Sequence, residues 1–415
     1  MDKTVVELFA GVGGFRVGLN NITKMNKNGV AIENGDFKFL WANQWEPSTI
    51  AQHAFDCYKK RFACNDLECS NKDISKINKR EIPTHTLLCG GFPCQDYSVA
   101  RSLKNEKGIE GKKGVLWWEI NDILKKKKPP FVLLENVDRL IKAPSKQRGQ
   151  AFGIMLRCFY EQGYSVEWRV INAAQYGHPQ RRRRLFIFAF KKNTKHYKQI
   201  SKVNYENVLK SKGIFAKQFP ITLDENKIKK IDIYTYNDLI DISENFSANF
   251  EDSGYMINGV AYTVKASPIM VSPIKLNDIV LSNVSNEYFL TEEKIKKFKY
   301  LRSAKKVLRT RKSDGGTYYY SEGAMSEYDS LDLPGRTMLT SEGTINRSTH
   351  IIKDPQNGQI RLLTPIECER LNQFPDNWTN TMPKRKRYFM MGNALVCGII
   401  SKLGLEISSI IEKEE

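Results

Sequence analysis

The stretch TVVELFAGVGGF, Thr4–Phe15, joins a short apolar run to a turn that contains three glycines. The apolar residues at 4–10 predict a buried strand, and the residues from Phe15 to about Asn21 predict the helix that follows. Glycines at such a turn let the backbone approach a ligand and leave amide groups free to bind it. The dinucleotide fingerprint GxGxxG is not met, because Arg16 stands where its third glycine would be. The turn therefore favours a nucleoside ligand without a pyrophosphate, and a tight turn without any ligand is the alternative.

The alternation of strand and helix patterns continues from this stretch to about residue 191. Apolar runs predict further strands at 37–43, 84–90, 131–137, 164–173 and 185–190. Helical spacing of apolar residues predicts helices at 48–62, 116–128 and 151–163. Strands that alternate with helices predict an α/β fold with a largely parallel sheet, in which ligands bind at the carboxyl ends of the strands.

The pattern changes after residue 191. The chain becomes rich in Asn, Lys, Asp and Ser, with only short apolar runs, and this predicts a second, smaller, irregular, β-containing domain with long loops. Helical patterns resume at 363–374 and at 392–411. We therefore expect one domain from residues 1–191 plus 389–415 and a second from residues 192–388.

The charge of the chain indicates the class of its partner. The 415 residues include 65 Lys and Arg against 46 Asp and Glu, a formal net charge of +19, which favours a nucleic acid. A generally lysine-rich proteome is the alternative reading. Because no run of 18 apolar residues and no secretion signal occurs, we expect no membrane contact and a cytoplasmic protein. The eight cysteines form no CxxC pair, so we expect reduced thiols and no metal site.

Polar residues follow two of the predicted strands at the edge where ligands bind. Cys94 lies in GGFPCQ, directly after the strand at 84–90, and Glu135 ends the strand at 131–137. A nucleophilic cysteine must be a thiolate, so a positive charge is expected near it. Alternate residues of an extended segment face the same way, so Arg182 and Arg184 of QRRRR are expected to point together into the site. Taken singly, an inert buried cysteine, a helix-capping carboxylate and a solvated basic run remain the alternatives.

Taken together, these motifs closely resemble those of the DNA (cytosine-5) methyltransferase family of bacterial restriction–modification systems. The resemblance covers the first 190 residues and about the last 60, in the order of the family. The matching segments are ELFAGVGGF (7–15), GGFPCQ (90–95), ENV (135–137), QYGHPQRRRRLF (175–186), RLLTPIECERLNQFP (361–375) and GNALV (392–396). The segment PGRTMLTSEG (334–343) resembles the Thr-Leu-bearing part of the family's target-recognition region.

The resemblance implies a fold, a reaction and a set of site residues. It implies a Rossmann-like S-adenosylmethionine-dependent methyltransferase domain with a smaller target-recognition domain. The reaction would transfer a methyl group from S-adenosylmethionine to carbon 5 of a cytosine flipped out of double-stranded DNA, leaving S-adenosylhomocysteine. The catalytic residues would be Cys94, as the nucleophile that forms a covalent adduct, and Glu135, which would bind the base edge. Arg182 would hold Glu135 or the base, and Arg184 would steady the nucleophile loop or the substrate. Cofactor binding would fall to Phe9, Gly11, Gly13, Gly14, Gln44, Trp45, Asp73, Ile74, Pro93 and Asn393.

The resemblance also implies how the enzyme is used. DNA contacts are expected from Gln95, Ser98, Gln180 and Thr337. The enzyme would be the protective half of a restriction–modification system, a monomer that works apart from its cognate restriction endonuclease. It would be cytoplasmic in a bacterium and associated with the nucleoid through DNA.

Departures and rival functions limit these expectations. Gln44 stands where the family has an acid for the cofactor's ribose, and Ala394 follows Asn393 where a small polar residue is more common. A transfer-RNA cytosine methyltransferase of the same fold would carry a Cys-Phe-Thr tripeptide, which is absent. A catalytically dead DNA-binding relative conflicts with the intact Cys94, Glu135 and Arg182. A nicotinamide-dependent oxidoreductase conflicts with the missing third glycine and with the Pro-Cys turn.

Overall fold

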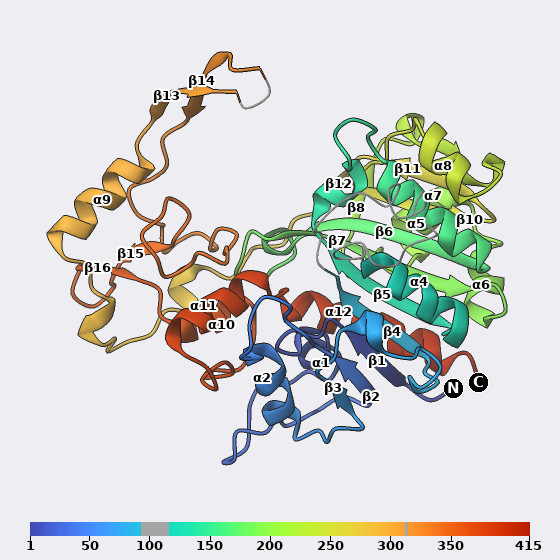
Figure 1. Ribbon diagram of the computed structural model, residues 1–415, viewed down its shortest axis with the longest axis horizontal. Helices are drawn as coiled ribbons and strands as arrows, with labels where there is room; N and C mark the ends of the chain where they lie inside the picture. The colour runs from blue at the N-terminus through green and yellow to red at the C-terminus, as the bar shows by residue number, and fades with distance from the viewer. Residues whose placement is uncertain (93–115, 312–313) are drawn as a thin grey trace.

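The computed structural model describes residues 1–92, 116–311 and 314–415. Ten of the described strands form one large sheet (Figure 1). Its order is β3 (Cys69–Ser70), β2 (Lys38–Asn43), β1 (Thr4–Leu8), β4 (Leu87–Gly91), β5 (Phe131–Asn136), β7 (Arg183–Lys191), β6 (Tyr164–Asn172), β10 (Ser253–Ile257), β11 (Val260–Val264) and β9 (Lys229–Asp232).

The large sheet is parallel in one half and antiparallel in the other. Strands β3, β2, β1, β4 and β5 run parallel, whereas β7 is antiparallel to both β5 and β6. The expectation of a largely parallel sheet therefore holds for the first five strands only. The reversal arises because residues 173–182 turn the chain back after β6 and place β7 between β5 and β6. The α/β class is confirmed.

The sheet extends beyond the predicted domain boundary. Strands β9, β10 and β11 lie within residues 229–264. Strand β10 pairs with β6, β11 pairs with β10, and β9 is the edge strand of the large sheet. The sequence there reads as loops because strands such as KKID are short and partly charged. These residues, which we had placed in the second domain, are part of the sheet that carries the first domain.

Alternate residues of the central strands face two different sets of helices. Val5, Leu87, Leu133 and Phe188 belong to one buried cluster, and Val6, Leu88, Leu134 and Ile187 belong to the other. The first face packs on α1 (Gly14–Leu19), α2 (His53–Phe62), α6 (Lys195–Ile200) and α12 (Cys397–Glu412). The second face packs on α4 (Leu116–Lys127), α5 (Gln150–Glu161) and α8 (Leu239–Asn245). Helices on both faces are what a parallel sheet requires.

Residues 274–388, which we call the small lobe, lie to one side of the large sheet (Figure 1). They contain short elements that form no extended sheet. These are α9 (Glu292–Arg302), β13 (Lys305–Thr310), β14 (Thr317–Glu322), β15 (Ile351–Lys353), β16 (Ile360–Leu362), α10 (Pro365–Leu371) and the start of α11 (Lys384–Asn393). Strand β8 (Ile221–Leu223) pairs with β12 (Ala266–Pro268), and α7 (Tyr205–Asn207) lies beside β11, where Tyr205 stacks on Tyr262.

The last predicted helix begins later than its apolar pattern suggested. Helix α12 begins at Cys397, because Ala394 and Val396 are extended and separate it from α11. Within the described ranges, no single helix is long and apolar enough to cross a membrane, although α11 and α12 together reach that length across a 45° bend. The same ranges contain no group of three His, Cys, Asp or Glu side chains placed to hold a metal ion.

Candidate active site

Three strand ends meet where the sequence placed the chemistry. Leu8 at the end of β1 pairs with Gly90 of β4, and Gly91 pairs with Glu135 of β5. A side chain at Gly91 would lie 3.1 Å from Oε2 of Glu135, so the glycine keeps this edge open beside the carboxylate. The chain then continues into residues 93–115. Pro93, Cys94, Gln95 and Ser98 lie there, outside the described residues, and their roles stay predictions.

The segment that leads to Cys94 is held from β5. The Asn136 side-chain amide donates a hydrogen bond to the Phe92 carbonyl, at 2.9 Å, and Asn136 is 2% exposed. This contact fixes the backbone two residues before Cys94. Asn136 belongs to the motif ENV but was given no role of its own from the sequence. The feature that could have identified it is a polar residue at the end of a buried strand, next to the candidate glutamate.

Glu135 forms an ion pair with Arg184 across the antiparallel β5–β7 boundary. Arg184 Nε lies 2.8 Å from Glu135 Oε1, and the two side chains are 18% and 13% exposed. Burial raises the pKa of Glu135 above its ordinary value, and the positive charges of Arg184 and Arg182 oppose that shift. A carboxyl group in this setting exchanges a proton at a higher pH than a solvated one, which suits a proton donor.

The two arginines of the QRRRR segment have different roles from those expected. Arg182 and Arg184 do point inward, while Arg181 and Arg183 are exposed. However, Arg184 rather than Arg182 binds Glu135. Arg182 is buried, and burial lowers its pKa to about 9. Its guanidinium donates to the carbonyls of Met338, Gly392 and Asn393, at 3.0, 2.9 and 3.2 Å.

Gln180, which was predicted to contact DNA, is buried and makes contacts within the protein. It is 0% exposed, and its amide donates to Asn372 Oδ1 at 2.9 Å and accepts from the Met338 amide at 3.0 Å. Thr337 is half-buried, and its hydroxyl donates to the Arg181 carbonyl. The main chain continues this seam, since Gly335 N donates to Pro179 O and Arg181 N donates to Gly335 O. Residues 335–338 are thus joined to residues 179–182.

The glycine-rich turn fits a ligand that contacts the backbone. Phe9 and Gly11 have positive φ angles of 54° and 57°, and a side chain at Gly11 would meet no atom within 4 Å. Gly13 and Gly14 instead lie against Phe62 and Leu395, so those two glycines are required by packing. Gln44 accepts a hydrogen bond from the Gly11 amide at 2.8 Å, which places it beside the turn.

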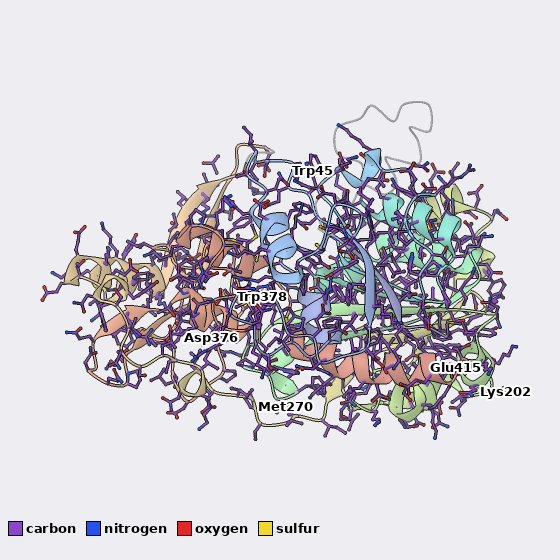
Figure 2. The ribbon with its side chains drawn as sticks, turned by 90° about the horizontal axis from the view of Figure 1, so that it is seen from below. Trp45, Lys202, Met270, Asp376, Trp378 and Glu415 are labelled. Atoms are coloured by element: carbon purple, nitrogen blue, oxygen red, sulfur yellow. The ribbon has the colours of Figure 1, made fainter. Side chains whose placement is uncertain are left out.

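The other predicted cofactor residues surround this edge with different degrees of exposure. Trp45 follows Gln44 and is 38% exposed (Figure 2). Asp73 caps a short helical turn by accepting from the Ser75 amide, and Ile74 is buried in the core. Asn393 is exposed at the end of α11. Gln44 and Asp73 each use one side-chain oxygen in these bonds, which leaves the Gln44 NH₂ group and the second Asp73 oxygen for a nucleoside beside Phe9, Gly11 and Trp45. The residues present therefore fit the expected cofactor.

A contact from the small lobe supports the same turn and was missed by sequence analysis. The Trp378 indole Nε1 donates to the Val12 carbonyl at 2.8 Å, and Trp378 is 0% exposed. The Trp378 carbonyl in turn accepts from Arg61 Nε at 2.6 Å. This contact could not be predicted from the sequence, because nothing in the local sequence around Trp378 points to residue 12.

The chain matches a family model for C-5 cytosine-specific DNA methylase over residues 3–409. The chain belongs to the C-5 cytosine-specific DNA methylase family. It is therefore a DNA (cytosine-5) methyltransferase, as the motifs indicated.

Two curated relatives match nearly the whole chain. It is 52% identical to the Type II methyltransferase M.Sau3AI of Staphylococcus aureus, over 98% of this chain and 95% of that one. It is 31% identical to the Type II methyltransferase M.HhaI of Haemophilus parahaemolyticus, over 97% and 94%. Among solved structures, the Dnmt2 methyltransferase of S. pombe has a TM-score of 0.57 at 15% identity, and the chains cover each other to 99% and 98%. That likeness confirms the Rossmann-like methyltransferase fold.

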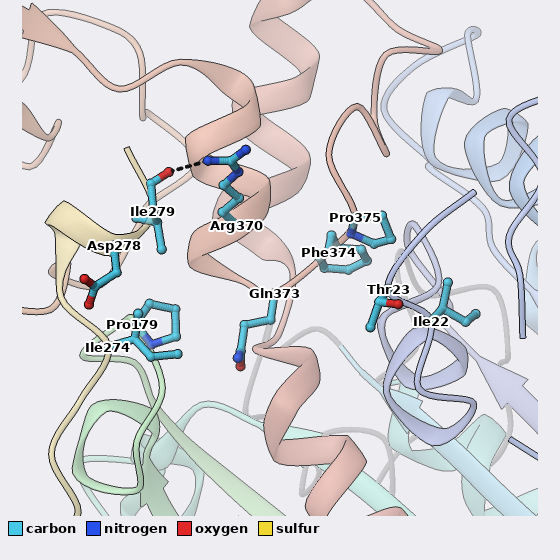
Figure 3. Close-up of a pocket in the computed structure, with 10 residues that line it drawn as sticks. All are labelled: Ile22, Thr23, Pro179, Ile274, Asp278, Ile279, Arg370, Gln373, Phe374 and Pro375. Carbon is cyan, nitrogen blue, oxygen red and sulfur yellow. Dashed lines mark hydrogen bonds between the residues drawn. The ribbon is translucent and has the colours of Figure 1, made fainter. Parts of the chain in front are cut away.

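A separate pocket of about 540 Å³ lies where α10 meets residues 274–279 and the chain after α1 (Figure 3). Arg370 at its rim donates to the Ile279 carbonyl at 3.0 Å and pairs with Asp376 at 2.6 Å. None of the predicted catalytic or cofactor residues lines it. This pocket belongs to the seam between the small lobe and the large sheet.

Proposed function

We propose that this methyltransferase acts through a covalent adduct between Cys94 and a cytosine flipped out of double-stranded DNA. Carbon 5 of cytosine is a poor nucleophile, and attack of a thiolate on carbon 6 makes it reactive. The ring is attacked on its face, so the base must leave the stack. Once carbon 5 carries the methyl group, a base takes the carbon 5 proton, the C5–C6 double bond re-forms, and the bond between carbon 6 and sulfur breaks to release the Cys94 thiolate.

Glu135 would bind the edge of the base and place a proton at ring nitrogen 3, which stabilises the adduct. The ion pair between Glu135 and Arg184 is the observation that carries this proposal, because it holds the carboxyl at the edge where the Cys94 segment begins. Arg184 would fix the orientation of Glu135, and Asn136 would fix the start of the nucleophile segment through Phe92. Arg182 would act indirectly, by holding residues 338 and 392–393 against the site.

Phe9, Gly11, Gln44, Trp45 and Asp73 would hold S-adenosylmethionine at the ends of the parallel strands. When bound there, this cofactor supplies an electrophilic methyl group. Gly11 offers open space on its Cβ side, and the Gln44 amide can bond a ribose hydroxyl where relatives use an acid.

DNA would lie between the large sheet and the small lobe, with lysines and arginines of both contacting phosphates. Affinity should then fall steeply with salt. Base reading would fall to residues 192–388, with Thr337 and the neighbouring loops as candidates. The Type II relatives support a role in a bacterial restriction–modification system, in which this enzyme would be the protective half. That it works as a cytoplasmic monomer beside a separate endonuclease stays a prediction.

Base-resolution mapping of 5-methylcytosine tests this function. Purified protein, S-adenosylmethionine and unmethylated DNA should give methylation at one short recurrent sequence. A Cys94→Ala protein that still methylated DNA would overturn the covalent mechanism. Activity on transfer RNA but not on DNA would overturn the substrate assignment.

A further inference from the structure

Strands β13 and β14 form a hairpin, which we call the arm, that projects beyond the other elements of the small lobe (Figure 1). The two strands pair only with each other among the described strands. Residues 306–310 of β13 are all exposed. An isolated two-stranded hairpin is marginally stable in water. An exposed hairpin of this kind therefore suggests that its surface binds a partner.

Large apolar and aromatic side chains cover the arm on both faces. Leu308 and Tyr319 are 56% and 62% exposed on one face, and Val307 and Tyr318 are 45% and 41% exposed on the other. Exposed groups of this kind gathered on one element mark an interaction surface.

The charge of the arm selects a polyanion as the partner. Lys305, Lys306 and Arg309 are positive, and Glu322 is the one carboxylate on the two strands. Glu322 is already occupied, because it accepts from Arg347 at 3.2 Å and from the Tyr320 hydroxyl at 2.8 Å. Asp314, in the turn between the two strands, lies 3.4 Å from Arg311. The carboxylates among the described residues of the arm are therefore already paired with arginines, whereas Lys306 has no carboxylate partner and can meet a phosphate backbone.

The base of the arm is fixed to the small lobe. Arg347 donates to the Leu301 carbonyl at 3.0 Å and to Glu322 at 3.2 Å, so it binds both ends of the hairpin. Arg302, which is 2% exposed, donates to the Ser326 carbonyl at 3.0 Å and to Asp329 at 2.8 Å. These contacts give the arm a set direction.

One face of the arm is free to bind. Arg309 stacks on Tyr320 at 3.7 Å and Lys305 on Tyr300 at 4.2 Å, on the face that also carries Glu322. The opposite face carries Lys306, Leu308 and Tyr319. These three side chains form no hydrogen bond or ion pair with another described residue, although Lys306 lies 4.6 Å from the ring of Tyr319.

We propose that the arm is a ribbon that enters the major groove of DNA and reads bases with Lys306, Leu308 and Tyr319. The inference rests on the proposed methylation of double-stranded DNA. The major groove admits a two-stranded ribbon, and there a lysine recognises the acceptors of guanine while an apolar side chain contacts the methyl group of thymine. The hydroxyl of Thr337 is bound to Arg181, so the arm is the better source of base contacts.

The experiment compares target profiles on a random-sequence duplex library by mapping 5-methylcytosine. Lys306→Gln and Leu308→Ser should each relax the preference at one target position by about tenfold. Lys202→Gln is the matched control, since Lys202 is exposed at the far end of the molecule from the small lobe (Figure 2), and its profile should not change. Unchanged profiles for both arm variants would overturn the proposal.

Two further measurements keep the outcome clear. Thermal unfolding and S-adenosylmethionine binding show whether an arm variant is folded. If one is not, a protein with residues 305–322 replaced by a short Gly-Ser turn gives the same profile test.

Acetylation of lysines in the wild-type protein, with and without duplex DNA, reports contact without catalysis. Protection of Lys306 but not Lys202 supports the arm even if no methylation occurs, which would defeat only the proposed function. DNA binding without protection of Lys306 would defeat the arm.

Discussion

The large sheet and the small lobe are held together by different interactions. Val5, Leu87 and Leu133 at the centre of the sheet are 0% exposed and belong to one cluster of buried apolar residues. In the small lobe the buried groups include Arg302, Arg361 and the carboxylates that bind them. An apolar core tolerates changes that keep its volume, whereas a buried ion pair requires both partners. The small lobe therefore depends more on specific buried ion pairs, and the centre of the sheet depends more on apolar packing.

The largest expected effect is on catalysis at the edge of the sheet. Glu135→Gln should lower the rate of methyl transfer about 10³-fold, because the amide cannot deliver the proton to the base. Single-turnover transfer to the mapped target sequence measures this. Glu167→Gln is the matched control, since Glu167 is a buried carboxylate of the same sheet that lies outside the candidate site. Equal losses in both variants would mean that Glu135 is only structural.

The next effect separates the two regions by stability. Arg361 lies 2.6 Å from Asp354 and 2.8 Å from Glu367, and all three side chains are buried. Arg361→Ala should reduce the free energy of unfolding by about 3–5 kcal/mol, because it leaves two carboxylates without their cation. Urea unfolding monitored by hydrogen exchange should show the small lobe opening before the sheet. Lys126→Ala, which breaks an exposed pair with Asp122, should cost only about 0.5 kcal/mol.

A smaller effect follows from a buried carboxyl in the sheet. Burial raises the pKa of Glu167 from an ordinary value of 4.5 to about 8. The folded protein holds this proton more tightly than the unfolded chain, so its stability should fall as pH rises from about 4.5 to 8. Glu167→Gln, which can still accept from the Ile214 amide, should flatten that slope in melting temperature. An unchanged slope would exclude Glu167 as its source.

The small lobe should respond to pH in the opposite direction. Burial would raise the pKa of Asp329, but the hydrogen bond from Arg336 and the surrounding positive charges outweigh it and hold the pKa below its ordinary value of 3.8. The stability that Asp329 contributes is present above pH 3.8 and is lost as pH falls below it. Hydrogen exchange at low pH should show the small lobe loosening first, and Asp329→Asn should remove that dependence. Loosening of both regions at the same pH would contradict the contrast between them.

The same contrast explains how far the sequence could be interpreted. Strands β1, β2, β4 and β5 follow apolar runs, and the inward direction of Arg182 and Arg184 follows from strand periodicity alone. The partners of those arginines could not be predicted, because Met338, Gly392 and Glu135 come together only through the fold. The burial of Gln180 was missed for the same reason. Strands β9–β11 and the ion pairs of the small lobe leave no periodic pattern.

The seam between residues 179–182 and 335–338 has a consequence for how such an enzyme can diversify. Gln180 binds the amide of residue 338, Arg182 binds its carbonyl, and the backbones of residues 179–181 and 335 bind each other. Within residues 335–338, every group offered apart from the Thr337 hydroxyl is a peptide group, which all residue types share, and Asn372 adds one side-chain oxygen from elsewhere in the small lobe. The contacts at this seam therefore depend little on which side chains residues 335–338 carry. Mutation can rewrite the specificity of the small lobe while its mounting on the catalytic sheet stays the same.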